Sequence, residues 1–334
     1  MPQSLLLLFA ALGVLGCARE PDLVVYCSLD QDFAEPLIRE FERETGLRVD
    51  AQFDVERNKT VGLVQRILAE RDHPRADVFW NNELAHTIRL KQAGATAAHD
   101  SATGRTLPEA FRDPEGHWYA FAARARVVLY RTDRDDPHPK RLDAMLEPAM
   151  AARGGLAKPL TGTTLTNFAV LAELRGREAA LDWLRRALDS DLTWGSGNAD
   201  VMRKVAEGRL SWCFTDTDDA ARAIDAGHPV AVEWLDQGPP GEGVLLIPNS
   251  ICVLAGAPHP DAAARFVDWV LRPEVEARLA QSPSRQIPVR PEVPPPPGYG
   301  RPGRDFPVLS TFDWERVAAS LEDRESDFRA LFVR

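Results

Sequence analysis

The chain has 334 residues, of which 44% are hydrophobic and 27% are charged, so it is long enough to bury a large core and to divide into two domains. Its formal net charge of −10 at pH 7 argues against nucleic acid and against an anionic membrane surface as main partners, because both bind a basic protein face. Any anion that this protein binds must therefore be held by a local group of donors.

The N-terminus has the pattern of a secretory signal. Residues 1–16 carry no charge, and the apolar run Leu5–Gly16 ends at Val14-Leu15-Gly16-Cys17, a lipoprotein-type cleavage site. Because this run is short for a membrane span, we expect residues 1–16 to be removed and the Cys17 thiol to carry lipid. The mature protein is then exported, to the periplasm or the outer face of the cell membrane.

Three further cysteines have no metal-ligand spacing. They lie in apolar, strand-like runs, where cysteine usually behaves as a small buried hydrophobe, although a disulfide between one pair remains open. These residues are Cys27, Cys213 and Cys252.

From Asp22 onward, apolar runs typical of strands alternate with amphipathic helical patterns. The first strands are expected at Leu23–Cys27, Val49–Phe53 and Ala76–Trp80. The helices that follow are expected around Phe33, Leu37 and Phe41, ended by Gly46, and at Val61–Glu70 and Leu84–Gln92. Later strands are expected at Arg126–Tyr130, near Leu156, and at Leu210–Phe214, Val230–Trp234, Gly243–Ile247 and Ile251–Ala255. Later helices are expected at Thr164–Arg175, Arg177–Asp189, Asn198–Gly208, Ala220–Ala226 and Pro260–Leu271. A further helix is expected to end at Gln281, and a last one to span Asp313–Phe332. This order predicts an α/β fold with a mostly parallel sheet and an irregular, proline-rich segment at 290–307.

A cluster of acidic residues follows one predicted strand. Residues 210–214 alternate in the apolar pattern of a strand, and Asp216, Asp218 and Asp219 come directly after it. In an open α/β sheet, ligands gather at the carboxyl ends of the strands. Three carboxylates in four positions predict a cation site, while the alternative is that they cap the helix at 220–226.

Five segments, in this order, resemble the ferric-iron-binding branch of the extracellular solute-binding proteins of ABC importers. The resemblance covers nearly all of the mature chain. The segments are Leu23-Val-Val-Tyr-Cys-Ser, Glu40-Phe-Glu-Arg-Glu-Thr-Gly, Ala76-Asp-Val-Phe-Trp-Asn-Asn-Glu, Gly243-Val-Leu-Leu-Ile-Pro-Asn-Ser and Ala257-Pro-His-Pro-Asp-Ala-Ala.

The resemblance implies the two-lobed, type II periplasmic-binding-protein fold with its ligand in the cleft between the lobes. Lobe one is expected at 22–124 plus 249–285, and lobe two at 125–248 plus 286–334. The lobes would close over the ligand as a hinged trap, and the importer permease would read the closed form. The protein is expected to be a monomer without enzymatic activity.

The resemblance also implies a set of metal ligands. In the family, two adjacent tyrosines follow a signature that matches Val205-Ala-Glu-Gly-Arg-Leu, and they fall here on Asp218 and Asp219. A family histidine corresponds to Asp30, and a family glutamate corresponds to Asn82, with Glu83 next to it. Oxygen donors of this kind suit iron(III) or another hard cation. Helix capping is the alternative role for Asp30, and for Asn82 and Glu83 the alternative is a solvated loop or the cap of the helix at Leu84–Gln92.

An anion that accompanies the metal is expected on the other side of the cleft. The turn Lys158-Pro-Leu-Thr-Gly-Thr-Thr begins a helix, whose free N–H groups attract anions, and it matches the family's anion-binding turn. Simple helix capping is the alternative. The residues expected to bind the anion are Thr161, Gly162, Thr163, Thr164, Arg124, Arg126 and Asn198.

Two other functions stay open at this point. A cleft with carboxylates at one end and anion donors at the other also fits an amine-bearing phosphonate or phosphate, such as 2-aminoethylphosphonate, bound without metal. The acidic cluster also suits Mg²⁺ in a phosphoryl-transfer enzyme, with Arg126 on the phosphate. Against an enzyme, the chain has no Gly-x-Ser-x-Gly, His-Glu-x-x-His or Walker motif, and its seven histidines are scattered.

Overall fold

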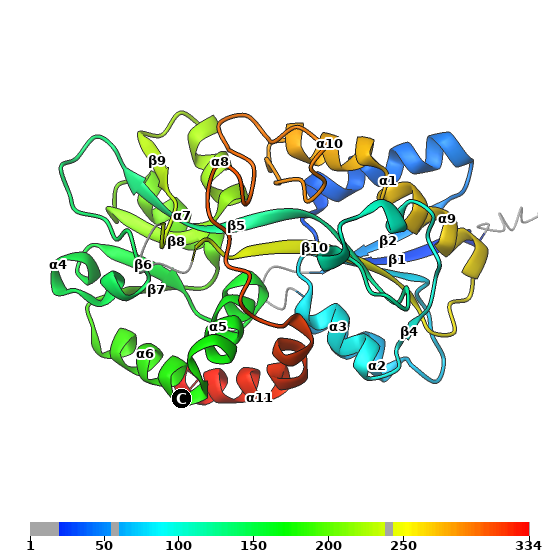
Figure 1. Cartoon of the computed structure of the whole chain (residues 1–334), viewed down its shortest axis with the longest axis horizontal. Helices are drawn as coiled ribbons and strands as arrows, with labels where there is room; N and C mark the ends of the chain where they lie inside the picture. Colours follow the sequence, from blue (N-terminus) through cyan, green and yellow to red (C-terminus); the bar gives the residue numbers. More distant parts are fainter. Residues whose placement is uncertain (1–19, 55–59, 238–242, 334) are drawn as a thin grey trace, which may run out of the picture.

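The computed structural model describes residues 20–54, 60–237 and 243–333, so the predicted signal segment and Cys17 lie outside the described residues. Two α/β lobes lie side by side and are joined in the middle by two long strands, β5 and β10 (Figure 1). Within the described ranges, no helix combines the length and the apolar character that crossing a membrane requires.

Lobe one has the β-α-β-α-β order that its apolar runs predict. Strands β1 (Leu23–Cys27), β2 (Val49–Phe53) and β3 (Val78–Asn81) are parallel, in the order β2-β1-β3. The other edge of β3 pairs with β10. Helix α1 (Gln31–Thr45) ends at Gly46, which has the left-handed conformation (φ 73°) that glycine adopts without steric cost. The other elements of this lobe are α2 (Val61–Ala69), α3 (Ala85–Gln92), β4 (Thr96–Ala97), α9 (Pro260–Val270) and α10 (Pro273–Gln281), with 3₁₀ turns at Gly104–Thr106 and Glu109–Phe111.

The two strands that join the lobes pair with each other. Strand β5 (Tyr119–Arg131) is antiparallel to β10 (Leu246–Leu254), and the register shifts between Pro248 and Asn249. The prediction of two separate strands at Gly243–Ile247 and Ile251–Ala255 is therefore wrong. Proline has no N–H to donate to a ladder, and the irregularity in the pairing accommodates it within one continuous strand.

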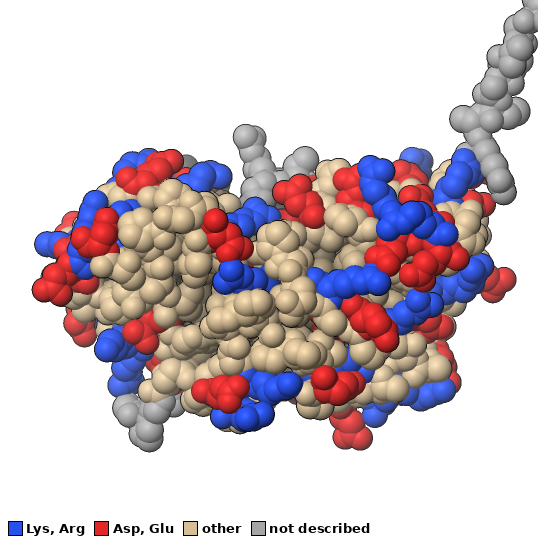
Figure 2. Space-filling model, turned by 90° about the horizontal axis from the view of Figure 1, so that it is seen from above, with Lys and Arg blue, Asp and Glu red and all other residues tan. Residues whose placement is uncertain are grey.

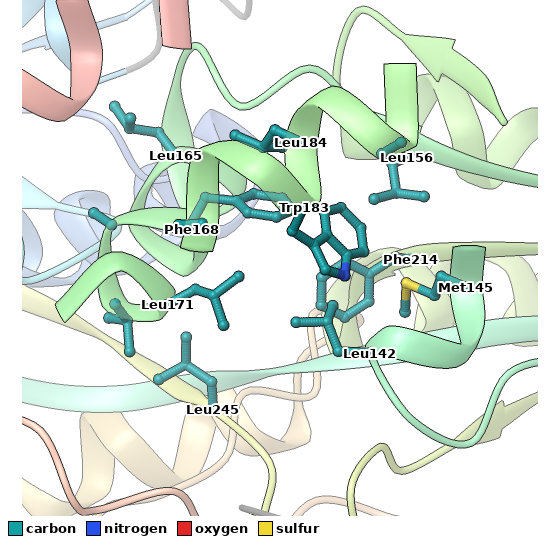
Figure 3. Close-up of a cluster of buried hydrophobic side chains, with 14 of the residues drawn as sticks. Leu142, Met145, Leu156, Leu165, Phe168, Leu171, Trp183, Leu184, Phe214 and Leu245 are labelled. Carbon is teal, nitrogen blue, oxygen red and sulfur yellow. The ribbon is translucent and has the colours of Figure 1, made fainter. Parts of the chain in front are cut away.

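The sheet of lobe two has the strand order β5-β8-β6-β7, and β6 is parallel to both β7 and β8. Its elements are α4 (Pro148–Ala151), β6 (Gly154–Ala157), α5 (Gly162–Arg175), α6 (Arg177–Asp189), β7 (Thr193–Gly195), α7 (Asn198–Ala206), β8 (Trp212–Asp216), α8 (Thr217–Asp225) and β9 (Val230–Glu233), with a 3₁₀ turn at Asp143–Leu146. Phe168, Trp183 and Phe214 fill the middle of its core (Figure 3). Cys27, Cys213 and Cys252 are buried as predicted, and burial raises the pKa of the Cys252 thiol to about 12.

The C-terminal helix α11 (Trp314–Phe332) touches both lobes. It lies at the bottom of Figure 1, where it packs against α3 of lobe one and against α5 and α6 of lobe two. Its Val317, Leu321 and Phe328 join the apolar core of lobe two, whereas toward α3 it presents the carboxylates of Glu322 and Glu325. Toward lobe one the helix is held by these charged contacts together with apolar packing, because Ala318 and Trp314 also contact the apolar cluster that contains Ile88.

Candidate functional site

A polar pocket lies where the two lobes meet. It has a volume of about 70 Å³ and is formed by the residues after β1 and β3, by Arg124 of β5, by the end of β8 and by the first turns of α5, α7 and α8. Most of the predicted site residues line it: Asp30, Asn82, Arg124, Thr161, Gly162, Thr163, Thr164, Asn198, Asp216, Asp218 and Asp219. The predicted residues that do not line it are Glu83 and Arg126.

The three aspartates after β8 lie close together. Asp216 is the last residue of β8, and Asp218 and Asp219 stand in the first turn of α8. One carboxylate oxygen from each of the three lies within 4.8 Å of the others. The positive end of the α8 dipole favours negative charge at this position, and Thr215 donates a hydrogen bond to Asp219 (2.9 Å). Such a group of oxygens has the chemistry of a site for a hard cation.

Asp216 is held by donors from three elements. Its Oδ1 accepts a hydrogen bond from Arg126 Nη1 at 2.6 Å, and its Oδ2 accepts from Thr163 Oγ1 (2.5 Å) and Asn198 Nδ2 (3.0 Å). Arg126 is 2% exposed, and its guanidinium carbon lies 4.2 Å from the centre of the Phe214 ring. The expectation that Arg126 faces a free anion in the cleft therefore does not fit the structure, because Asp216 stands between Arg126 and the pocket.

Arg124 does reach the pocket. Alternation along β5 puts Arg124 and Arg126 on the same side of the strand, but about 6.6 Å apart, so they meet different neighbours. Arg124 donates to the backbone carbonyl of Asn82, and its Nη1 lies 3.8 Å from Asp218 Oδ2. Its Nε is buried and has no hydrogen-bond partner among the described residues. Arg124 thus brings a positive charge beside the aspartates.

Asp30 and Arg222 connect the lobes at the pocket. Asp30 precedes α1, yet its side chain accepts no capping hydrogen bond, and its Oδ2 accepts instead from Arg222 Nη2 of α8 at 2.8 Å. The Arg222 guanidinium also lies 4.8 Å from the centre of the Phe33 ring. Arg222 was missed in the sequence, although helical spacing from Asp218 (i, i+4) puts both on one face of α8.

Asn82 and Glu83 separate in the structure. Asn82 lines the pocket, and its Oδ1 accepts from Thr60 Oγ1 at 2.7 Å. Glu83 is fully buried, away from the pocket, and its two carboxylate oxygens accept hydrogen bonds from five groups. The donors are Asn81 Nδ2, His86 N, His86 Nδ1, Ala85 N and Thr166 Oγ1, at 2.7 to 3.2 Å. Glu83 therefore caps α3 and contacts α5, as its alternative role predicted, and is not placed to bind a metal.

One face of the molecule is mixed in charge. Figure 2 shows acidic and basic side chains interspersed over the upper face, with no extended basic patch in that view. This distribution agrees with the net charge of −10 and with a ligand held by local groups in a pocket.

Comparisons with known proteins agree with this architecture. The chain is 24% identical to Iron uptake protein A1 of Synechocystis sp. over 324 residues, covering 94% of this chain and 83% of that protein. It is also 24% identical to the Major ferric iron-binding protein of Neisseria meningitidis over 327 residues, covering 93% and 90%. The crystal structure of iron-bound HitA from Pseudomonas aeruginosa superimposes with a TM-score of 0.80 at 23% identity, covering 92% of this chain and 98% of that one, which confirms the two-lobed fold. Residues 36–302 match the sequence pattern of the bacterial extracellular solute-binding proteins, and the chain belongs to that family.

Proposed function

We propose that this protein is the substrate-binding component of an ABC importer and that its cargo is iron(III) or another hard cation. The observation that carries this proposal is the group of three aspartate oxygens within 4.8 Å in the interlobe pocket. Carboxylate oxygens are the donors that hard cations prefer. The names of the relatives, an iron uptake protein and a ferric iron-binding protein, support iron in particular.

The cation would bind mainly to Asp218 and Asp219, the positions that match the tyrosine pair of the ferric-binding branch. Asn82, from lobe one, reaches the same pocket and offers a further amide group. The proposal assigns no chemical step to the pocket: the protein binds its cargo and delivers it unchanged to a permease. A lipid on Cys17 would keep the protein at the membrane, and we propose that it works there as a monomer.

We place the boundary between the lobes within the two long strands. Lobe one then comprises residues 22–124 plus 249–285, and lobe two comprises 125–248 plus 286–334. The register shift between Pro248 and Asn249 supports a boundary at this point of β10. In β5 the boundary follows Arg124, because this residue lines the pocket between the lobes. Rotation of the lobes about these strands would open the pocket, with Asp30 and Arg222 moving apart.

A thermal-shift titration of the mature protein tests the cargo. Ligand at ~100 times its Kd stabilises the folded state by about 2.7 kcal/mol, which gives a clear rise in Tm. We expect ferric citrate to raise the Tm, the same solution with excess EDTA not to raise it, and the variants Asp218→Asn and Asp219→Asn to lose the response. A rise with 2-aminoethylphosphonate in metal-free buffer, and none with ferric citrate, would instead assign the pocket to a zwitterion.

A further inference from the structure

Three of the residues that were predicted to bind a free anion surround a carboxylate of the chain itself. Arg126, Thr163 and Asn198 come from β5, α5 and α7, and all three donate to the side chain of Asp216. Their hydrogen bonds to its two oxygens are 2.5 to 3.0 Å long. The Asp216 side chain is 5% exposed, so water contributes little to its solvation.

These donors have the composition of an anion-binding site. A guanidinium, a hydroxyl and an amide converge on one point, and Thr163 and Asn198 stand in the first turns of α5 and α7, where the helix dipoles favour negative charge. Asn198 is also fixed from its other side, because its Oδ1 accepts a hydrogen bond from Thr164 Oγ1 at 2.9 Å. Asp216 occupies this cradle, in which only Nη1 of Arg126 contacts the carboxylate, while Arg126 Nε and Nη2 are buried and have no hydrogen-bond partner among the described residues.

We propose that Asp216 is a built-in anion: its carboxylate takes the place of a free anion in a cradle made by Arg126, Thr163 and Asn198. This inference rests on the proposed binding of a cation beside it. Asp216 then acts as a positioning residue, which joins β8 to α5 and α7 and fixes the start of α8, where Asp218 and Asp219 face the cargo. It follows that cation binding in this protein needs no added anion in the cradle.

The first test uses no metal. In Asp216→Ala the carboxylate is removed and the cradle is left empty, so formate, the smallest carboxylate, should enter it. We expect formate to raise the Tm of Asp216→Ala saturably by several degrees beyond the effect of equal sodium chloride, and to leave wild type unchanged. The matched control is Asp218→Ala, which removes the same charge two residues away and should show no formate-specific rise. A folded Asp216→Ala protein that ignores formate would overturn the inference.

The second test measures cation affinity with Tb³⁺, a hard trivalent luminescent probe, in a buffer without carboxylates. Wild type should bind with the same Kd, within about twofold, whether or not formate or acetate is added. Asp216→Ala should bind at least tenfold more weakly and regain most of its affinity in formate. Asp216→Asn fills the cradle without the charge, so it should be weakened and stay weak in formate.

The two tests separate the inference from the proposed function. If wild type does not bind Tb³⁺ or ferric citrate, the cation proposal fails, while the formate response of the metal-free variant still decides whether the cradle binds anions. If wild type binds Tb³⁺ only when a carboxylate is added, the built-in anion is refuted and the cation proposal stands. If Asp216→Ala does not fold, two other results decide the inference. Wild type must bind Tb³⁺ equally well with and without an added carboxylate, and Asp216→Asn must bind it more weakly than wild type.

Discussion

His86 Nε2 lies 2.9 Å from Glu325 Oε1, a contact that joins α3 of lobe one to the C-terminal helix α11 across 239 residues of sequence. The imidazole is fully buried, and its Nδ1 lies 2.9 Å from Glu83 Oε1. Arg89 of α3 forms ion pairs with Glu325 and Glu322 of α11 at the same interface between the two helices. Burial by itself lowers the pKa of His86, but the charge of Glu83 and the hydrogen bond with Glu325 outweigh it and raise the pKa to about 9.

The buried His86 at the α3–α11 interface predicts that the protein loses stability in alkaline solution. Because the pKa of His86 is higher in the folded state, about 9 against an ordinary 6.5, its protonation stabilises the fold fully below pH 6.5. The contribution disappears as the pH rises through 9, and it is on the order of 3 kcal/mol at most. Urea unfolding at pH 6 and pH 9.5 checks this prediction. Wild type should lose more stability between these pH values than His86→Gln, and equal losses would contradict it.

The bridge between Asp30 and Arg222 predicts an effect on lobe closure. Both side chains are partly exposed, 26% and 34%, so the ion pair itself contributes about 1 kcal/mol or less. We expect Arg222→Ala to weaken cargo binding by up to about fivefold and to shift the apo protein toward a more open form, seen as a larger radius of gyration in X-ray scattering. Arg209→Ala, which removes an exposed arginine paired with Glu207, is the control and should change neither quantity.

The aspartates of the pocket predict opposite effects on stability and binding. The three carboxylates within 4.8 Å repel one another, and Arg126 and Arg124 offset only part of this repulsion. Asp219→Asn should therefore keep or raise the Tm of the metal-free protein by a small amount while reducing cation affinity by about 100-fold, or about 3 kcal/mol. Calorimetric titration with Tb³⁺ measures the affinity. Asp225→Asn, in the last turn of the same helix, serves as a control, and a similar loss there would argue against a local site.

Gly154 predicts a purely structural defect in lobe two. A Cβ at this position would lie 2.1 Å from the indole of Trp212, which is fully buried in β8. Because the ring has no room to move, Gly154→Ala should destabilise the protein by about 1–3 kcal/mol through overpacking. Chemical denaturation measures this loss. Tb³⁺ affinity at temperatures where the variant is folded should be unchanged, and a weakened site would show that the two regions are coupled.

Much of the fold was predictable from apolar periodicity. Strands β1 and β2 have their predicted residues, and α1 buries the predicted Phe33, Leu37 and Phe41 and ends at Gly46, because buried faces repeat at 3.6 or 2 positions. The grouping of Asp216 with Asp218 and Asp219 was predictable because they follow one strand directly. The partners of individual charges were not predictable, since they depend on distant segments: Arg126 meets Asp216 across 90 residues, and Arg222 meets Asp30 across 192.

The orientations of the neighbours Asn82 and Glu83 were also not predictable from the sequence. Its neighbour Asn82 faces the pocket, while Glu83 is directed into the interior and meets His86 and Thr166. The sequence places both residues after the same strand, β3. Which of them faces the cleft depends on partners that are distant in the sequence, such as Thr166 for Glu83 and Thr60 for Asn82, and no local pattern reports those contacts.

The position of β10 has a consequence for how the chain folds. This strand lies between β3 and β5 in the sheet, yet it comes more than 160 residues after β3 in the sequence. Until β10 pairs with it, one edge of β3 has no strand partner, and lobe one is completed only when Leu246–Leu254 and the helices α9 and α10 that follow have docked. Such long-range pairing slows folding, because the closure of a long loop must come before the contact stabilises it. The rate-limiting step of refolding should accordingly be the docking of β10, and substitutions in this strand should slow folding more than they speed unfolding.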